Sequence, residues 1–319
     1  MAPRLEKLLL LDTASLYFRA FYGVPDTVKA PDGTPVNAVR GLLDIIAKLV
    51  TTYRPTHLVA CWDDDWRPQW RVDLIPSYKA HRVVEIVPGG SDIEEVPDPL
   101  EAQIPVIREA LAALDIPIVG RAEYEADDII GSLAAQASVA FDIVTGDRDL
   151  IQLVDDATEV RVIYTARGMS NLEVVTDAVV VKKYGVLPTQ YADFAVMRGD
   201  ASDGLPGVPG VGEKTAATLL AAHGDLTGIL AAAEAGEGMS AGVRAKITAA
   251  LPYLAVAPTV VEVARDLDLT PEDGTNPDAT PLGSLNPESL ASARELAEKW
   301  ALGTAMERAI TALTAPTVD

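Results

Sequence analysis

Acidic residues of this 319-residue chain stand where they could hold metal ions. Nine of them follow predicted strands or open predicted helices: Asp12, Asp63, Glu125, Asp127, Asp128, Asp147, Asp149, Asp200 and Asp203. Carboxylates packed together raise one another's pKa, so they cannot all ionise without a compensating cation. Oxygen ligands without cysteine or histidine favour Mg²⁺ or Mn²⁺ over zinc. More carboxylates than one ion needs indicate two ions, the arrangement used in phosphodiester hydrolysis.

Each acid also has an interpretation that involves no metal. An acid at the end of a strand is often the N-cap of the next helix, and an acid in a first helical turn favours the helix dipole. For Glu125, Asp127 and Asp128 taken alone, this second interpretation is the better one, and "TGDRD" taken alone could be a turn. The metal hypothesis therefore depends on convergence, because ligand sites gather beyond the carboxyl ends of parallel strands.

Short apolar runs that end in an acid or a turn must bring these acids together. Their nearly continuous apolar character indicates buried strands at Lys7–Asp12, His57–Asp63, Asp115–Gly120, Phe141–Asp147 and Val160–Thr165. Amphipathic patterns between them predict helices at Gly41–Tyr53, Ile104–Leu114 and Ala126–Ala137. This alternation predicts an α/β fold, with a mostly parallel central sheet and helices on both faces.

Three other segments have a different character. Val83–Ala102 carries three prolines, two glycines and several acids, and we expect a mobile loop or a poorly ordered insertion there. After about Val180 the predicted strands stop, and the chain is helical to about Leu251. Asp268–Ser289 is predicted to be a turn-rich connector, and Ala291–Leu313 is predicted to be one last helix.

Composition limits the class of protein. The formal net charge is −21, which taken alone argues against a nucleic-acid partner unless bound cations reverse the local sign. Cys61 is the single cysteine, so the chain forms no internal disulfide and no cysteine-based zinc site. The start, "MAPRLEKLLLLD", indicates a buried strand rather than a signal peptide, and no apolar run approaches the length of a membrane helix. We expect a cytoplasmic protein without a membrane partner.

The stretch "GDASDGLPGVPGVGEKTAATLL" pairs two aspartates with a glycine-rich turn before a helix. Glycines let backbone N–H groups approach an anion, and the helix that begins near Glu213 offers its positive end. The spacing differs from that of a P-loop, which argues against a nucleoside triphosphatase. A glycine-rich turn is weakly specific by itself, but beside Asp200 and Asp203 it would grip a polyanion next to bound metals.

Seven motifs, taken in order, resemble one family. They are "LLLLDTASLYFRAFYG", "THLVACWD", "YKAHR", "YEADDIIG", "TGDRDLIQLV", "KKYGVLP" and "MRGDASDGLPGVPGVGEKTA". Together they resemble the 5′-nuclease domain of bacterial DNA polymerase I, which is grouped with the flap endonucleases. The resemblance covers roughly Leu8 to Leu251. No polymerase motif follows, so the resemblance implies a free-standing flap endonuclease and 5′–3′ exonuclease.

The resemblance implies a nuclease core at residues 1–180 with a helical arch or clamp at about 71–102. It also implies a helix–hairpin–helix region at 181–260, which leaves a C-terminal helical extension at 261–319. Asp12, Asp63, Glu125 and Asp127 would serve the first ion. Asp127, Asp128, Asp147, Asp149, Asp200 and Asp203 would surround the second. Counting from His57 selects Asp63, whereas counting back from Trp70 selects Asp64; we prefer Asp63 because it directly ends the strand.

Basic and aromatic residues complete the site that the resemblance implies. Lys79 and Arg82 of "YKAHR" would neutralise the scissile phosphate, although the residues alone favour a solvated helix face. Arg19 and Arg71 are weaker candidates for phosphate contact, and Tyr22 and Tyr78 would stack on a frayed base or belong to the core. The hairpin would hold a K⁺ ion and contact duplex DNA. Its contact residues would be Gly207, Gly210, Gly212, Lys214 and Thr215, supported by Lys182 and Lys183.

Together with the resemblance, these features predict a nuclease that uses two Mg²⁺ or Mn²⁺ ions. The resemblance implies 5′-flap, nicked or gapped DNA and RNA–DNA primer junctions as its substrates. The resemblance implies a role in primer removal and repair, beside DNA polymerase and ligase, and we take a monomer as the default. A non-catalytic junction binder would be favoured if ligand acids were missing, but all nine are present. A related ribonuclease is the third alternative, against which the hairpin argues.

Overall fold

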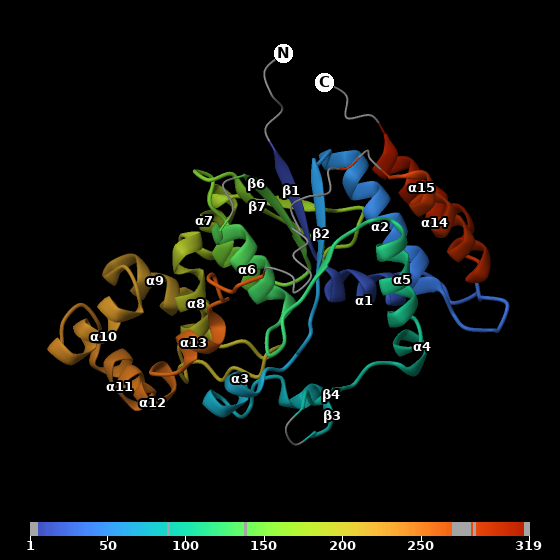
Figure 1. The fold of residues 1–319 in the computed structure, drawn as a ribbon. Helices are drawn as coiled ribbons and strands as arrows, with labels where there is room; N and C mark the ends of the chain where they lie inside the picture. Colours follow the sequence, from blue (N-terminus) through green and yellow to red (C-terminus); the bar gives the residue numbers. More distant parts are fainter. Residues whose placement is uncertain (1–5, 88–89, 137–138, 270–281, 283–284, 316–319) are drawn as a thin grey trace, which may run out of the picture.

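A six-stranded sheet forms the centre of the computed structural model, which describes residues 6–87, 90–136, 139–269, 282 and 285–315 (Figure 1). The strand order is β5-β2-β1-β6-β7-β8, and all neighbours are parallel except the antiparallel pair β7 and β8. The strands are β1 (Lys7–Asp12), β2 (His57–Cys61), β5 (Ile118–Val119), β6 (Ala140–Thr145), β7 (Val160–Tyr164) and β8 (Glu173–Val175). The predicted α/β fold is confirmed, while β8 was not predicted.

Alternating side chains of the central strand divide the core into two layers. Leu8 and Leu10 of β1 pack with helix α6 (Ala126–Gln136) on one face of the sheet. Leu9 and Leu11 pack on the other face with α1 (Thr13–Gly23) and α2 (Asn37–Tyr53). Burying a leucine side chain stabilises the fold by roughly 1.5–3 kcal/mol, so these four residues fix β1 in the middle of the sheet.

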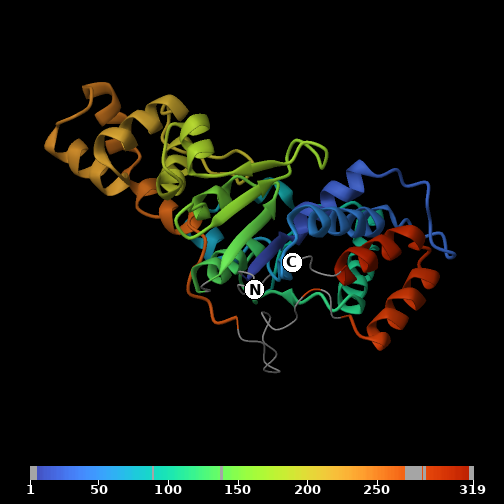
Figure 2. The same ribbon diagram turned by 90° about the horizontal axis from the view of Figure 1, so that it is seen from above.

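Helices from the end of the chain complete the second layer. The helices α5 (Ile104–Ala113), α14 (Pro287–Lys299) and α15 (Gly303–Thr314) share the core of α1 and α2, and Figure 2 shows α14 and α15 against this side. The prediction of one helix at Ala291–Leu313 is wrong. The chain turns between α14 and α15, where Ala301 and Gly303 have φ values of 51° and 48°. Residues in this left-handed region end a helix.

The helical region after the sheet shares the first core layer. It contains α7 (Asp177–Tyr184), α8 (Tyr191–Arg198), α9 (Glu213–His223), α10 (Leu226–Ala235), α11 (Ala241–Ala249), α12 (Leu251–Leu254) and α13 (Ala257–Val261). Buried residues of α8 and α9 join those of β6 and β7 in one cluster, while α9–α12 project away from the sheet (Figures 1 and 2). Within the described ranges, no single helix is long and apolar enough to span a membrane; α9 and α10 meet that test only as a pair bent by 84°.

In the part that the structure describes, the segment at about 71–102, expected to be a helical arch and a mobile loop, consists of short helices around a small β-hairpin. It contains α3 (Gln69–Leu74), the 3₁₀ turn η1 (Ala80–Arg82), the antiparallel strands β3 (Val83–Glu85) and β4 (Ile93–Glu94), and α4 (Asp98–Glu101). A buried ion pair between Arg67 and Asp92 holds the hairpin, and Trp66 Nε1 donates to the Asp92 carbonyl at 2.7 Å. These long-range contacts order a segment whose composition suggested disorder. Most of the predicted connector at Asp268–Ser289 lies outside the described residues.

Candidate metal centre

Acids from five parts of the chain line one cavity of about 230 Å³ at the carboxyl edge of the sheet. Asp12 ends β1, while Asp63 and Asp147 each lie two residues beyond a strand, β2 and β6. Glu125 and Asp127 come from the start of α6. The predicted convergence is therefore present in the structure. Lys79, Arg82 and Glu94 also line this cavity, which we call the acid pocket.

Asp12 caps a helix and also lines the acid pocket. Its Oδ1 accepts a hydrogen bond from the Ser15 N–H at 3.2 Å, so it is the N-cap of α1. Its Oδ2 accepts from the Thr145 hydroxyl at 2.6 Å, which turns the carboxylate toward β6. Burial, followed by repulsion from Asp63, raises the pKa of Asp12 to about 7. A carboxyl group with this pKa stabilises the protein by capping a helix and still needs a cation to ionise fully at neutral pH.

Asp63 rather than Asp64 belongs to the acid pocket. Asp63 Oδ1 accepts from the Ala126 N–H at 2.7 Å, which ties the end of β2 to the start of α6. Burial raises the pKa of Asp63 to about 6, and Glu125 adds to the rise. Asp64 is exposed and packs against Gly120, where an added Cβ would lie 2.6 Å from Asp64 Oδ2. Asp63 thus lines the cavity, and Asp64 does not; the ligand role of Asp63 stays a prediction.

A second group of acids adjoins the first. Glu125 and Asp127 line both the acid pocket and a small neighbouring cavity, to which Asp149 and Asp203 also contribute. Burial, followed by repulsion from Asp147, raises the pKa of Asp127 and Asp149 well above their usual range. Burial also raises the pKa of Asp203. The two groups are therefore continuous, as two neighbouring ions would require.

Asp200 differs from the other acids of the second group. It lines neither cavity, and it accepts from Arg198 Nη2 at 2.9 Å and Arg148 Nη2 at 3.1 Å. Burial acts to raise the pKa of Asp200, but hydrogen bonds from Ser202 and the two guanidinium groups outweigh it and lower the pKa. Sequence analysis did not single out Arg148 or Arg198. The available signal was their place within "TGDRD" and "MRGD", beside the predicted acids.

Two cations of the protein hold acids of the site. Lys79 Nζ pairs with Glu125 Oε2. Burial acts to lower the pKa of Lys79, but Glu125 together with Tyr78 and Asp203 outweighs it and raises the pKa. Arg82 Nη2 contacts the Ser202 carbonyl at 2.8 Å and Asp203 Oδ1 at 3.4 Å. Among the described residues, no three side chains already form a finished set of metal ligands. The geometry places both predicted cations at the acids.

Asp128 and its neighbours correct three predictions. Asp128 is fully buried and pairs with Arg71 through both carboxylate oxygens, at 2.7 Å and 2.8 Å, so it is not free to bind a metal. Arg71 is only 3% exposed and cannot contact DNA in this arrangement. The Tyr78 ring is buried as well, and its hydroxyl donates to Glu125 Oε1 at 2.7 Å. Tyr78 is therefore a core residue and not a stacking platform.

Only some glycines of the predicted helix–hairpin–helix turn before α9 are exposed. Gly207 is buried against the chain, since an added Cβ would lie 2.5 Å from the Gly199 nitrogen. This corrects its assignment as a DNA contact. Gly210, Gly212 and Lys214 are exposed, Gly212 precedes the first residue of α9, and Thr215 is half-buried in its first turn. Lys182 and Lys183 are exposed on α7, where Lys183 pairs with Glu173.

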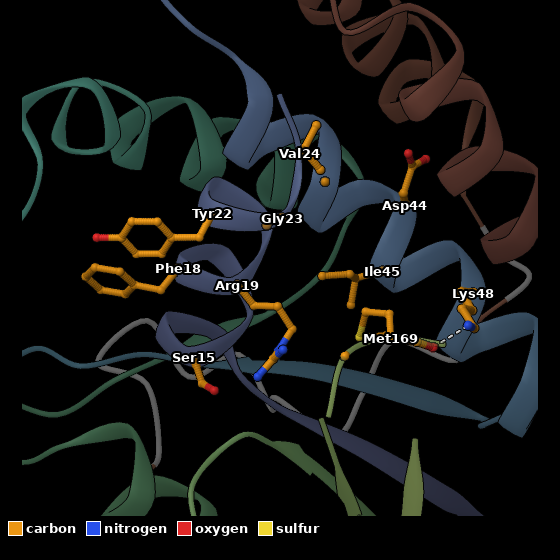
Figure 3. A pocket seen from close by; sticks show the side chains of 13 residues that line it. Ser15, Phe18, Arg19, Tyr22, Gly23, Val24, Asp44, Ile45, Lys48 and Met169 are labelled. Carbon is orange, nitrogen blue, oxygen red and sulfur yellow. Dashed lines mark hydrogen bonds between the residues drawn. The ribbon is translucent and has the colours of Figure 1, made fainter. Parts of the chain in front are cut away.

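A larger cavity of about 810 Å³ opens beside the acid pocket, between α1 and α2 (Figure 3). Ser15 and Phe18 line both cavities. Tyr22 is 72% exposed, and it and Phe18 project from the same face of α1, four residues apart (Figure 3). Arg19 also lines this cavity, and its Nε is buried without a hydrogen-bond partner among the described residues. The predicted Arg19 and Tyr22 thus line one cavity, which shares Ser15 and Phe18 with the acid pocket.

Similarity to known proteins covers almost the whole chain. The family model for the N-terminal resolvase-like domain of 5′-3′ exonucleases matches residues 7–185, and that for their C-terminal SAM fold matches 186–279. A 5′-3′ exonuclease of Streptomyces coelicolor is 59% identical over 308 residues, covering 96% of this chain and all of that protein. One from Mycobacterium tuberculosis is 49% identical over 310 residues, covering 94% of this chain and 96% of its own.

A longer protein and two more distantly related solved structures are also similar to this chain. DNA polymerase I of Mycobacterium bovis is 43% identical over 227 residues, which cover 70% of this chain and 24% of the polymerase. The solved structure of T5 5′-exonuclease with zinc matches with a TM-score of 0.64 at 15% identity, over 92% of this chain and 99% of that one. The catalytic core of Rad2 with DNA substrate matches with a TM-score of 0.58 at 17% identity, over 96% and 92%. These two structures share the fold. The family models and the similar sequences show that the chain belongs to the 5′-3′ exonuclease family.

Proposed function

We propose that this protein is a structure-specific 5′ nuclease that hydrolyses phosphodiesters at 5′ flaps, nicks and duplex 5′ ends of DNA. The observation that carries the proposal is the acid pocket, where Asp12, Asp63 and Asp147 meet the start of α6 beside Lys79 and Arg82. A clustered set of carboxylates with two cations beside it suits a phosphate substrate and divalent ions. Two of the relatives named above are called 5′-3′ exonucleases.

The acids fit Mg²⁺ or Mn²⁺. Their donors are all carboxylate oxygens, and burial with mutual repulsion raises the pKa of several of them, so a divalent cation would offset a charge that the fold leaves uncompensated. We assign Asp12, Asp63, Glu125 and Asp127 to a first ion. Asp127, Asp147, Asp149, Asp200 and Asp203 would surround a second ion and its water shell. Bound ions of this kind activate water and stabilise charge on the leaving oxygen.

Lys79 and Arg82 would act on the scissile phosphate. Both side chains line the acid pocket, and each already contacts an acid of the site. A cation fixed where negative charge develops lowers the barrier more than one in free solution, because it needs no reorganisation during the reaction. Glu125 would pass from Lys79 to an ion, which would free the ammonium group to contact phosphate.

The remaining basic and aromatic residues would hold the DNA outside the pocket. Exposed Gly210, Gly212 and Lys214 at the start of α9 would contact the duplex backbone through N–H groups and charge, together with Thr215 and a K⁺ ion. Lys182 and Lys183 would add contacts from α7. The cavity beside α1 would take an unpaired nucleotide, stacked on Tyr22 and held by Arg19.

The cellular role that follows is removal of RNA primers during DNA replication, and DNA repair. The protein would act as a cytoplasmic monomer alongside DNA polymerase and ligase. Its net charge of −21 means that affinity for DNA would depend on divalent ions and on a few local basic contacts. Affinity would therefore fall with rising salt.

A 5′-labelled flap duplex tests the proposed function. The purified protein would be incubated with this duplex in Mg²⁺, in Mn²⁺ or in excess chelator, beside a single-stranded RNA of matched length. We expect cleavage near the junction of single strand and duplex, and none with chelator. Tight binding without cleavage under either metal would favour a junction binder. Preferential cleavage of the RNA would favour a ribonuclease.

The raised pKa values predict how stability depends on pH. Between their ordinary value of 3.8 and about 7, Asp12 and Asp63 hold more protons in the folded protein than in the unfolded chain. Stability in chelator should therefore fall as pH rises through this window, because the unfolded state then binds fewer protons than the folded state. Mg²⁺ should restore the melting temperature, and more at about pH 8 than at about pH 5. Thermal unfolding at both values with and without Mg²⁺ checks this; an equal Mg²⁺ shift at both would contradict it.

A further inference from the structure

Arg71 and Asp128 form a buried ion pair directly behind the acid pocket, and the proposed reaction gives neither a role. Two hydrogen bonds join them, from Nη1 to Oδ2 at 2.7 Å and from Nη2 to Oδ1 at 2.8 Å. Arg71 comes from α3 and Asp128 from the first turn of α6. Burying two charges costs free energy that their attraction does not always recover, so such a pair is weak evidence for a purely stabilising role.

Asp128 is saturated by four donors. Besides the two guanidinium contacts, its Oδ2 accepts from the Glu125 N–H at 3.2 Å and its Oδ1 from the Ala264 N–H at 2.9 Å. The first of these bonds fixes the backbone of Glu125, one of the proposed ligands. The second holds the chain just after α13 against the back of the site. Asp128 therefore orients a ligand residue without being able to act as a ligand.

Arg71 lies between two carboxylates and is closer to one of them. Its Nη1 is 2.7 Å from Asp128 Oδ2 and 3.2 Å from Glu125 Oε1, while its Nε donates to the Val260 carbonyl at 3.0 Å. A guanidinium group buried beside a metal-binding carboxylate competes with the metal for that carboxylate. Asp128 supplies a matched bidentate partner, which draws the charge of Arg71 away from Glu125.

We propose that Asp128 is a positioning residue whose negative charge keeps Arg71 from capturing Glu125, so that Glu125 stays available to a divalent cation. The inference rests on the proposed function, because it takes Glu125 as a ligand. It predicts opposite effects for the two partners. Asp128→Asn leaves Glu125 as the only charged partner of Arg71 in this pair of acids, which weakens cation binding. Arg71→Gln removes the competing charge and strengthens it.

The test is a titration of the intact protein with Mn²⁺, in which free Mn²⁺ is followed by electron paramagnetic resonance. We expect Asp128→Asn to raise the Kd for Mn²⁺ about tenfold, the lower end of the range for changes behind a metal ligand. Arg71→Gln should lower the Kd several-fold. The matched control is Asp142→Asn. Asp142 is also fully buried and accepts two hydrogen bonds from Arg161, but it lies beside Lys7 at the other end of β1 from Asp12. This variant should bind Mn²⁺ like the wild type.

Circular dichroism shows which variants are folded. Asp128→Asn and Arg71→Gln are expected to change the Kd for Mn²⁺ in opposite directions, so either variant, if folded, tests the inference by itself. A Kd like that of the wild type in Asp128→Asn, or weaker binding in Arg71→Gln, would overturn the inference. Equal weakening in Asp142→Asn would do the same, since it would show a general loss of structure. Wild-type protein that binds Mn²⁺ but does not cut the flap duplex would overturn the proposed function and leave the inference standing. Wild-type protein that binds no Mn²⁺ would overturn both.

Discussion

Asp63→Asn should abolish cleavage of the flap duplex and stabilise the folded protein at the same time. We expect cleavage to fall about 1,000-fold or more, because losing one ligand of a catalytic ion costs several kcal/mol. Asparagine keeps an oxygen for the Ala126 N–H and removes a charge whose pKa is raised to about 6. In chelator at about pH 8 the variant should therefore be more stable than the wild type, by about 1–3 kcal/mol.

Asp64→Asn is the matched control for this change. It removes the same charge one residue away, at an exposed position outside the acid pocket. Its cleavage rate and melting temperature should stay near those of the wild type. Single-turnover cleavage and thermal unfolding of both variants measure the two effects. A loss of activity in Asp64→Asn with full activity in Asp63→Asn would exchange the roles of the two residues.

Lys79→Gln should lower kcat about 100-fold, with a smaller change in KM. The physical reason is the loss of a cation that is fixed beside the place where phosphate charge develops, which is worth about 2.7 kcal/mol in comparable sites. Glutamine retains a donor for Glu125, so the acid keeps a partner. Steady-state kinetics on the flap duplex in saturating Mg²⁺ separate the two constants.

Lys182→Gln provides the comparison for Lys79→Gln. Lys182 is exposed on α7, does not line the acid pocket, and is proposed only to screen phosphate. Its loss should raise KM modestly, more so at low salt, and leave kcat unchanged. If Lys79→Gln instead changed KM alone, Lys79 would be a binding residue and the proposed catalytic role would fail.

The sequence predicted the structure most reliably where the local residue pattern and burial agree. The range of β1 was predicted to the residue, because four consecutive leucines end at a single acid. The convergence of Asp12, Asp63 and Asp147 followed from the rule that parallel strands end at one edge of a sheet. Their positions did not depend on any long-range side-chain contact.

Two of the errors share a physical cause, which is contact between distant segments. Asp127 and Asp128 are adjacent acids in one motif, and only the position of Arg71, 57 residues from Asp128, separates a candidate ligand from a buried partner. The hairpin β3–β4 was missed because proline, glycine and acids dominate its sequence, while Asp92 is held by Arg67, 25 residues earlier. Periodicity does not report such pairings. The break between α14 and α15 has a local cause instead, which is the left-handed backbone conformation of Ala301.

The packing of α15 on α2 has a consequence for the order in which the molecule is made. Arg308 of α15 donates two hydrogen bonds to Asp44 of α2, at 2.8 Å and 2.9 Å, across 264 residues of chain. Ribosomes release the chain from its N-terminus, at roughly 5–20 residues per second. The strands of the sheet are therefore all synthesised well before α15 exists to cover α2. Until then, the face of α2 that α15 covers stays open to solvent and to chaperones, so this part of the second core layer closes only after α15 has been synthesised.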